Sequence, residues 1–238
     1  MLRFNALLDI ILPPVCLGCR SEGMYVCLEC LNSIELYNLL VCPICRRRDG
    51  QGRIDEYCRK ESGLTRFLGS PLPYSDEKVK KIIHSFKYNY AKEAALPLSQ
   101  ILIDFLDKNR FSEITKPKPE KIIVPVPLFH LRERERGFNQ SEELAKNISS
   151  YYNIALVSKS LIKIKNTGPQ AEIKDKGTRS KNVQGVFAVK NERLIRDKVV
   201  VLLDDVYTSG STMRECSRVL RQSGAREVWG ITLARGKI

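Results

Sequence analysis

Two adjacent acids, Asp204 and Asp205, follow an apolar run and precede a loop of small hydroxyl-bearing residues around one glycine. This loop consists of Thr208, Ser209, Gly210, Ser211 and Thr212. Its backbone N–H and side-chain O–H groups can converge on a phosphate, and the N-terminus of a following helix adds a favourable field. The acids would repel a bare phosphate, but carboxylates accept hydrogen bonds from vicinal hydroxyls and hold Mg²⁺ through water. The pattern therefore predicts a site for a ligand with hydroxyls next to its phosphate, such as a ribose 5-phosphate.

Three arginines, Arg132, Arg134 and Arg136, occupy alternate positions after another apolar run. Their guanidinium groups can bind a diphosphate in a bidentate manner. Because glutamates alternate with them, a solvated Arg/Glu face is an equally good interpretation of Arg132 and Arg134. Arg136 is the stronger candidate, since it begins the sequence Arg-Gly-Phe-Asn-Gln at a strand-to-helix turn, where open α/β sheets bind ligands.

Seven of the eight cysteines lie in the N-terminal quarter of the chain, as in a local module. Cys16, Cys19, Cys27 and Cys30 form two C-x-x-C pairs. Their thiolates can surround a tetrahedral Zn²⁺. Without a metal so small a segment can hardly bury enough surface to fold, so the spacing predicts a structural zinc site rather than free thiols. The eighth cysteine, Cys216, lies in a helical pattern and is expected to be a small buried apolar residue.

A second cysteine set begins with Cys42-x-x-Cys45 and continues with Cys58, but Glu61 stands where the spacing predicts a fourth cysteine. Three interpretations stay open. Glu61 supplies an oxygen ligand, the second zinc site is lost, or the pairs combine in another order. The two histidines are isolated from these pairs and are not expected to be ligands.

The elements that would position these residues are typical of an α/β fold. Segments 122–126, 198–203 and 228–234 are short apolar runs, as expected of strands buried on both faces. A helical pattern between the last two runs ends at Gly224, and Gly is favoured just past a helix. Together they predict a βαβ unit with a right-handed crossover, and hence a parallel sheet flanked by helices. Another helix is expected from Phe138, capped by Asn139 or Ser141.

The 238 residues give room for one α/β core and a small appendage. Composition predicts two domains, a cysteine-rich zinc-binding module at 1–61 and an α/β domain at 65–238. Within the second, segment 65–111 has a mixed helical pattern, and the Lys-Pro-Lys-Pro-Glu sequence at 116–120 is typical of a linker.

The chain is basic, with 40 Lys and Arg against 27 Asp and Glu and a formal net charge of +13. This balance favours polyanionic partners such as phosphates or nucleic acid. Segment 159–181 holds seven of these charges, at Lys159, Lys163, Lys165, Lys174, Lys176, Arg179 and Lys181. Such a stretch can form a lid over a diphosphate, a contact for DNA or a solvated loop.

The cysteine distribution predicts a reducing compartment, and no apolar run approaches the roughly 20 residues that span a bilayer. We therefore expect a soluble, cytoplasmic protein without a membrane span. The segment Met1 to Pro14 lacks the features of a signal peptide, although a short amphipathic helix there can still touch a partner or a membrane surface.

The strand, the two acids and the hydroxyl loop resemble the 5-phosphoribosyl-1-pyrophosphate (PRPP) signature of type I phosphoribosyltransferases. The resemblance implies that Asp204 and Asp205 bind the ribose hydroxyls and that Thr208 to Thr212 cradle the 5′-phosphate, with Mg²⁺ accompanying PRPP. Purine-salvage members carry an acid where Thr208 stands. Its absence argues against purine-base chemistry and leaves the general base unassigned, with Arg136 as the one catalytic candidate. PRPP binding is thus better supported than turnover.

Together with the cysteines, the string that begins at Arg136 resembles the ComF family, bacterial proteins linked to natural transformation. Further matches are Phe86-Lys87-Tyr88 and the stretch from Asn166 through Phe187. The resemblance covers nearly the whole chain. It implies a double-zinc-ribbon-like module, a PRPP-binding domain and a role in DNA uptake, with single-stranded DNA and uptake-machinery proteins as partners. The alternatives are a true phosphoribosyltransferase with an unidentified acceptor and a nucleic-acid-binding module whose sugar-phosphate site is vestigial.

Overall fold

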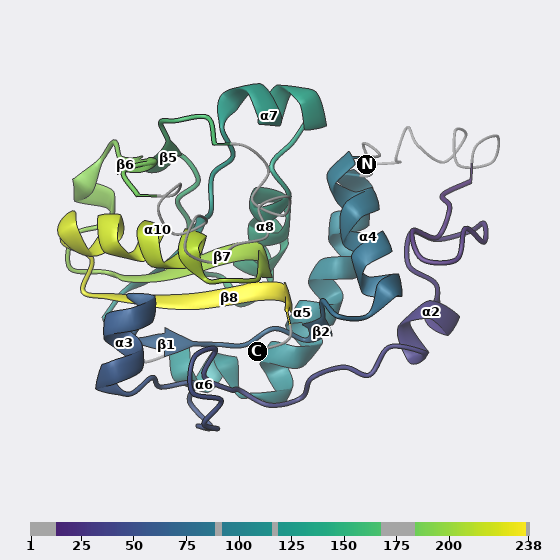
Figure 1. The fold of residues 1–238 in the computed structure, drawn as a ribbon, viewed down its shortest axis with the longest axis horizontal. Helices are drawn as coiled ribbons and strands as arrows, with labels where there is room; N and C mark the ends of the chain where they lie inside the picture. The colour runs from purple at the N-terminus through teal and green to yellow at the C-terminus, as the bar shows by residue number, and fades with distance from the viewer. Residues whose placement is uncertain (1–12, 89–91, 116–118, 168–183, 237–238) are drawn as a thin grey trace.

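The computed structural model describes residues 13–88, 92–115, 119–167 and 184–236. Its centre is a parallel sheet with the strand order β1-β8-β7-β3-β4, and β2 pairs with β8 beyond the end of β1 (Figure 1). The strands are β1 (Arg66–Phe67), β2 (Leu72–Pro73), β3 (Lys121–Pro125), β4 (Ala155–Leu156), β7 (Val199–Tyr207) and β8 (Glu227–Arg235). The predicted parallel sheet flanked by helices is confirmed, with β3, β7 and β8 at the three apolar runs.

Helices cover both faces of this sheet. The α-helices are α2 (Leu28–Asn32), α3 (Glu56–Ser62), α4 (Glu77–Tyr88), α5 (Ala95–Lys108), α6 (Phe111–Thr115), α7 (His130–Arg136), α8 (Gln140–Tyr152) and α10 (Ser211–Gln222). Two 3₁₀ turns, η1 (Lys92–Ala94) and η3 (Glu192–Leu194), complete the helical elements of the described residues. A separate antiparallel ribbon consists of β5 (Leu161–Lys163) and β6 (Phe187–Val189).

The alternation of side chains along β7 explains why both faces are covered. Val199, Val201 and Leu203 point into a core formed with α4, α5 and α8, whereas Val200 and Leu202 point into a second core under α10. All five side chains are fully buried. A strand with apolar residues on both faces is stable only between two layers, and this layering places the carboxyl end of β7 next to the beginnings of α8 and α10.

Local capping fixes where these helices begin. The Asn139 side chain accepts a hydrogen bond from the N–H of Ser141 and caps α8, which confirms one of the two expected caps. Asn139 also donates to the carbonyl of Val126, 3.1 Å away, and so ties the start of α8 to the end of β3. Helix α10 is followed by Gly224 in the left-handed region, as its sequence predicts.

Three local features differ from the sequence-based expectations. Segment 65–111 contributes β1 and β2 to the sheet in addition to helices, and strands of two residues are too short to give a periodic signal. Strand β7 runs through both acids to Tyr207 rather than ending before them. The three arginines lie on the short helix α7, whose 3.6-residue period puts Arg132 and Arg136 on one side and Arg134 on another.

The cysteine-bearing segments lie in two different places. The loop with Cys16 and helix α2 lie beyond α4 at one end of the molecule, whereas α3 lies beside β1 and β8 (Figure 1). Ile54 and Cys58 pack in the same core as Val200 and Leu202 of the central strand. The division into 1–61 and 65–238 stays a prediction.

Several expectations concern residues outside the described ranges. They are the amphipathic helix before Pro13, the linker residues 116–118 and the part of the basic stretch from 168 to 181. Within the described ranges no helix is long and apolar enough to cross a membrane.

Candidate functional site

The two acids at the end of β7 have different neighbours. Asp204 accepts hydrogen bonds at one carboxylate oxygen from Ser141 Oγ (3.0 Å) and from the N–H of Asp205 (2.9 Å). Asp205 forms an ion pair with Lys87 at the end of α4, with 2.9 Å between Oδ2 and Nζ. The Lys87 and Asp205 side chains are only 20% and 12% exposed, so the pair is held within the protein rather than in bulk water.

Burial of two neighbouring carboxylates has an electrostatic consequence. Burial first, and the charge of Asp205 second, raise the pKa of Asp204. Burial alone would lower the pKa of Lys87, but the charge and hydrogen bond of Asp205 raise it overall. Lys87 and Asp205 balance each other's charge, and a cation such as Mg²⁺ at this edge of the sheet would stabilise the ionised form of Asp204.

The predicted hydroxyl loop lies directly beyond these acids. Residues 208–210 connect β7 to α10, and Gly210 adopts φ +74°. A side chain at this position would be strained and its Cβ would collide with the Tyr207 phenol, so the turn requires glycine. The five loop residues, Thr208, Ser209, Gly210, Ser211 and Thr212, line one small hollow together with Asp204. The sequence-predicted loop and at least one of its acids are therefore side by side at the N-terminus of α10.

Arg136 reaches the same region from α7. It donates to Gln140 Oε1 (3.0 Å) and to the Tyr88 hydroxyl (3.1 Å), and its guanidinium lies 4.8 Å from the centre of the Tyr88 ring. Gln140 in turn donates to the carbonyl of Lys87. Arg136 is thus connected to the helix end that holds Asp205.

Lys163 on β5 adds a further cation. Burial lowers its pKa, and the charge of Arg132 lowers it further, whereas Asp204 raises it. The Lys163 ammonium lies over the ring of Phe187 on β6, 5.8 Å from its centre. Lys163 was part of the basic stretch in the sequence, but nothing in the spacing distinguished it from the other lysines.

Sequence reasoning missed the contribution of α4. In the sequence, Lys87 and Tyr88 stand out only as part of the Phe86-Lys87-Tyr88 match to the ComF family. Ser141 stands out only as a candidate helix cap. No local pattern places them near Asp204 and Asp205, since α4 precedes β7 by more than 100 residues and the contact arises from packing. Two larger hollows, of about 710 and 740 Å³, lie at the opposite edge of the sheet, where β1, β3 and β4 begin, and are separate from this site.

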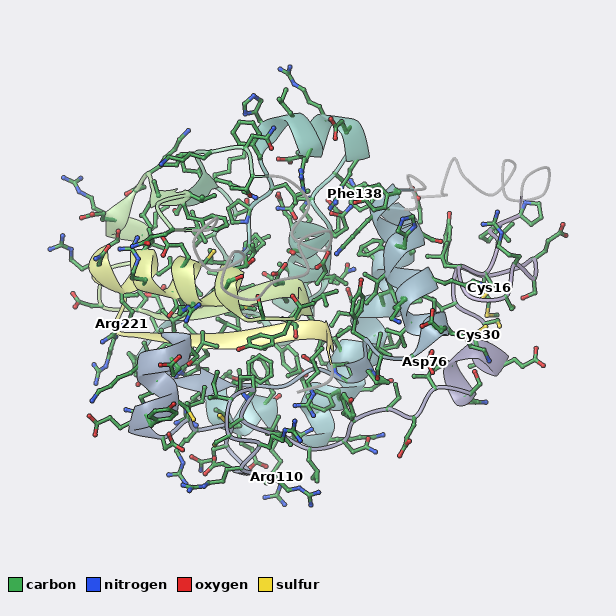
Figure 2. The ribbon with its side chains drawn as sticks, in the orientation of Figure 1. Cys16, Cys30, Asp76, Arg110, Phe138 and Arg221 are labelled. Carbon is green, nitrogen blue, oxygen red and sulfur yellow. The ribbon has the colours of Figure 1, made fainter. Side chains whose placement is uncertain are left out.

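The first cysteine set forms what we call the outer cluster. It consists of Cys16, Cys19, Cys27 and Cys30, whose sulfur atoms all lie within 4.8 Å of one another. The closest pairs are Cys16 with Cys30 (3.7 Å) and Cys19 with Cys27 (3.6 Å). Figure 2 shows Cys16 and Cys30 together beyond α4, near Asp76. Four sulfur ligands at this spacing fit a tetrahedral zinc ion.

The second cysteine set forms the inner cluster, which consists of Cys42, Cys45 and Cys58, with sulfur atoms again within 4.8 Å of one another. Glu61 is exposed and does not belong to this group. Among the described residues, no such group contains a histidine: His84 packs against Tyr88 and His130 against Phe129. Both clusters can bind a metal ion. Cys216 is fully buried, as expected of an apolar residue.

The comparisons with known proteins define the class of this chain. Residues 92–237 match the family model of the phosphoribosyl transferase domain, and this match includes the strands β3, β4, β7 and β8 of the sheet. The chain therefore belongs to the phosphoribosyltransferase fold family, in agreement with its parallel sheet and its loop between β7 and α10.

Relatives among characterised proteins specify the family further. Competence protein F of Haemophilus influenzae is 32% identical over 163 residues, which cover 66% of this chain and 69% of that protein. The DNA utilization protein YhgH of Escherichia coli is 27% identical over 224 residues, which cover 86% of this chain and 95% of that protein. The chain is a member of the ComF family.

A solved structure with a similar region is glutamine PRPP amidotransferase from B. subtilis, in complex with ADP and GMP. The two chains are 18% identical with a TM-score of 0.35, over 63% of this chain and 26% of the amidotransferase. This chain thus matches about a quarter of that enzyme's length.

Proposed function

We propose that this ComF-family protein binds PRPP with Mg²⁺ at the carboxyl end of β7. The observation that carries the proposal is the placement of Asp204 beside the hydroxyl loop that begins α10. In this arrangement Asp204 and Asp205 accept hydrogen bonds from the ribose hydroxyls, and residues 208–212 bind the 5′-phosphate at the helix N-terminus. Mg²⁺ would offset charge between the carboxylates and the diphosphate.

The cations around the acids support a diphosphate-bearing ligand. Arg136 lies on α7 and Lys163 on β5, and Arg132 shares the α7 face of Arg136. Guanidinium groups bind diphosphate oxygens in a bidentate manner. Lys87 acts in this proposal as a positioning residue, because its ion pair fixes the Asp205 carboxylate.

We further propose a cytoplasmic role in DNA uptake or utilisation, with zinc in both cysteine clusters. The names of the relatives, competence protein F and DNA utilization protein, support this role. The formal net charge of +13 suits single-stranded DNA as a partner, and proteins of the uptake machinery are the other expected partners. In this role PRPP is a signal or a structural ligand.

The cationic group also favours a second candidate, a phosphoribosyltransferase. An acceptor nucleophile would form a bond to ribose C1 while the bond from C1 to the diphosphate oxygen breaks, and Arg136 and Lys163 would stabilise the charge of the departing diphosphate. Thr208 stands where purine-salvage enzymes carry an acid, so the acceptor would have to be activated by another group or arrive as an anion.

Calorimetry with PRPP and Mg²⁺ tests the primary proposal. We expect binding by the zinc-loaded wild-type chain and its loss in Asp204→Asn/Asp205→Asn, with diphosphate release measured on the same samples to separate a binding protein from an enzyme. Asp104→Asn/Asp197→Asn, which changes two exposed acids away from the site, is the matched control and should bind like wild type. Absence of binding by a folded wild-type chain would contradict the proposal.

A further inference from the structure

We propose that Asp55 supplies the fourth ligand of a metal site in the inner cluster, together with Cys42, Cys45 and Cys58. This inference rests on the proposed zinc binding and names the ligand that the sequence left open. The resulting site has three sulfur ligands and one carboxylate oxygen, in contrast to the four sulfur ligands of the outer cluster.

The position of the Asp55 carboxylate carries the argument. Its Oδ2 atom lies 3.6 Å from Cys45 Sγ, about the separation of two ligand atoms on one tetrahedral zinc ion. The carboxylate thus contacts the thiol of Cys45 directly.

Local structure explains why Asp55 faces the cysteines. Asp55 is the N-cap of α3, and its Oδ1 atom accepts a hydrogen bond from the N–H of Cys58 at 2.9 Å. This bond fixes one carboxylate oxygen at the helix start and leaves Oδ2 facing Cys45. The mutually close set comprises the three sulfur atoms alone, so Oδ2 must move closer to them when the metal binds.

The charge of such a site is balanced by its surroundings. Three thiolates and one carboxylate carry four negative charges, and Zn²⁺ leaves two uncompensated. Arginines 46, 47 and 48 follow Cys45 directly, and Arg47 lies 3.9 Å from Asp55 Oδ2. These cations offset the excess negative charge without being ligands themselves.

Glu61 has the appropriate chemistry but the wrong position. It is one turn beyond Cys58 on α3, where spacing alone would allow it to reach the metal. Its side chain is exposed and stays outside the cluster, while its backbone carbonyl accepts a hydrogen bond from Arg214 of α10. The last turn of α3 is therefore held by α10, and the N-cap residue Asp55 is the one beside the thiols.

Metal titration of the full-length chain with three variants tests this assignment. Asp55→Asn removes the carboxylate but retains the helix cap, since Asn is as good an N-cap as Asp. Glu61→Gln is the matched control on the same helix, and Asp55→Cys converts the site to four sulfur ligands. The readouts are the zinc content, the affinity in chelator competition and the Co²⁺ absorption spectrum.

We expect two zinc ions per wild-type chain, and at least about a tenfold loss of affinity for one of them in Asp55→Asn, the scale on which metal-site substitutions act. Glu61→Gln should match wild type. With Asp55→Cys, the sulfur-to-cobalt charge-transfer absorption of the inner site should rise to that of the outer site. Unchanged affinity in Asp55→Asn, or a loss in Glu61→Gln alone, would overturn the assignment of Asp55. A wild-type chain with one zinc ion would instead refute zinc binding by the inner cluster, and with it this inference.

Discussion

The outer and inner cysteine clusters can both bind a metal ion through thiolates, but they pack against different parts of the molecule. The outer cluster lies in the loop before α2 and on α2 itself, and the adjacent Leu17 belongs to the same core as Val79, Ile82 and Ile83 of α4. The inner cluster shares the core under α10, where Cys42 and Cys58 are buried with Tyr207. A metal ion in the outer cluster would stabilise a local segment. A metal ion in the inner cluster would also stabilise the proposed phosphate loop.

Tyr207 is the physical connection between the inner cluster and that loop. Its ring packs edge-on against Phe67 with 5.2 Å between ring centres, and its hydroxyl lies beneath Gly210. Burial raises the Tyr207 pKa to about 12, and the charge of Cys42 contributes next. Tyr207 therefore shares a core with Cys42 and Cys58 of the inner cluster and lies against the turn at which phosphate is proposed to bind.

The largest expected effect comes from breaking this connection. Tyr207→Ala leaves a cavity between Phe67 and the loop, which should destabilise the fold by about 3–5 kcal/mol, as is usual for a buried aromatic residue. It should also weaken metal binding at the inner cluster but not at the outer one. Urea unfolding and chelator competition measure both effects. Tyr207→Phe retains the ring and is the control. An equal loss of both metal ions in Tyr207→Ala would contradict the claim that Tyr207 supports the inner cluster alone.

Two glycines with positive φ offer a comparison of the two regions. Gly23 near the outer cluster has φ +109° and open space around it, whereas Gly210 has φ +74° and meets the Tyr207 phenol. Gly23→Ala should cost about 1–2 kcal/mol, the strain of a left-handed Ala. Gly210→Ala should cost about 1–3 kcal/mol more because of the steric overlap. We also expect it to abolish PRPP binding, measured by calorimetry; equal effects of the two substitutions would contradict the account.

Removal of one metal ligand from each cluster tests whether PRPP binding depends on the inner cluster more than on the outer one. Cys30 and Cys58 are equally buried, at 3% and 0% exposure, so Ser substitutions at these positions have similar packing costs. Each variant should lose one zinc ion. PRPP affinity should fall about tenfold, or about 1.4 kcal/mol, in Cys58→Ser and stay within about twofold of wild type in Cys30→Ser. The reverse order of affinities would show that the outer cluster supports the site.

A smaller effect is expected from pH. The pKa of Asp204 is raised to about 7 in the folded state, so the folded chain binds more protons than the unfolded chain between about pH 4 and 7. The stability contribution of Asp204 is therefore highest at low pH and is lost as the pH rises toward 7. Urea unfolding at pH 5.5 and 8 measures it as the difference between wild type and Asp204→Asn, because the thiols of both clusters titrate alike in the two proteins. A difference that does not change with pH would contradict the assigned burial.

The sequence predicted the parts of the molecule that depend on local pattern. The three long apolar runs, the turn before α10 and the Asn139 cap follow from residue types and spacing, and the structure confirms these elements. The sequence did not predict what depends on packing. Lys87 and Tyr88 reach Asp205 and Arg136 only because α4 covers one face of the sheet. Asp55 in turn faces the thiols because it caps a helix too short to be recognised from periodicity.

A crystal structure of the zinc-loaded chain with Mg²⁺ and PRPP tests the central claim most directly. The account predicts density for the 5′-phosphate at residues 208–212, ribose hydroxyls at Asp204 and Asp205, and the diphosphate toward Arg136 and Lys163. Crystals grown at saturating PRPP with no ligand at the end of β7, or with the ligand bound at another edge of the sheet, would contradict it.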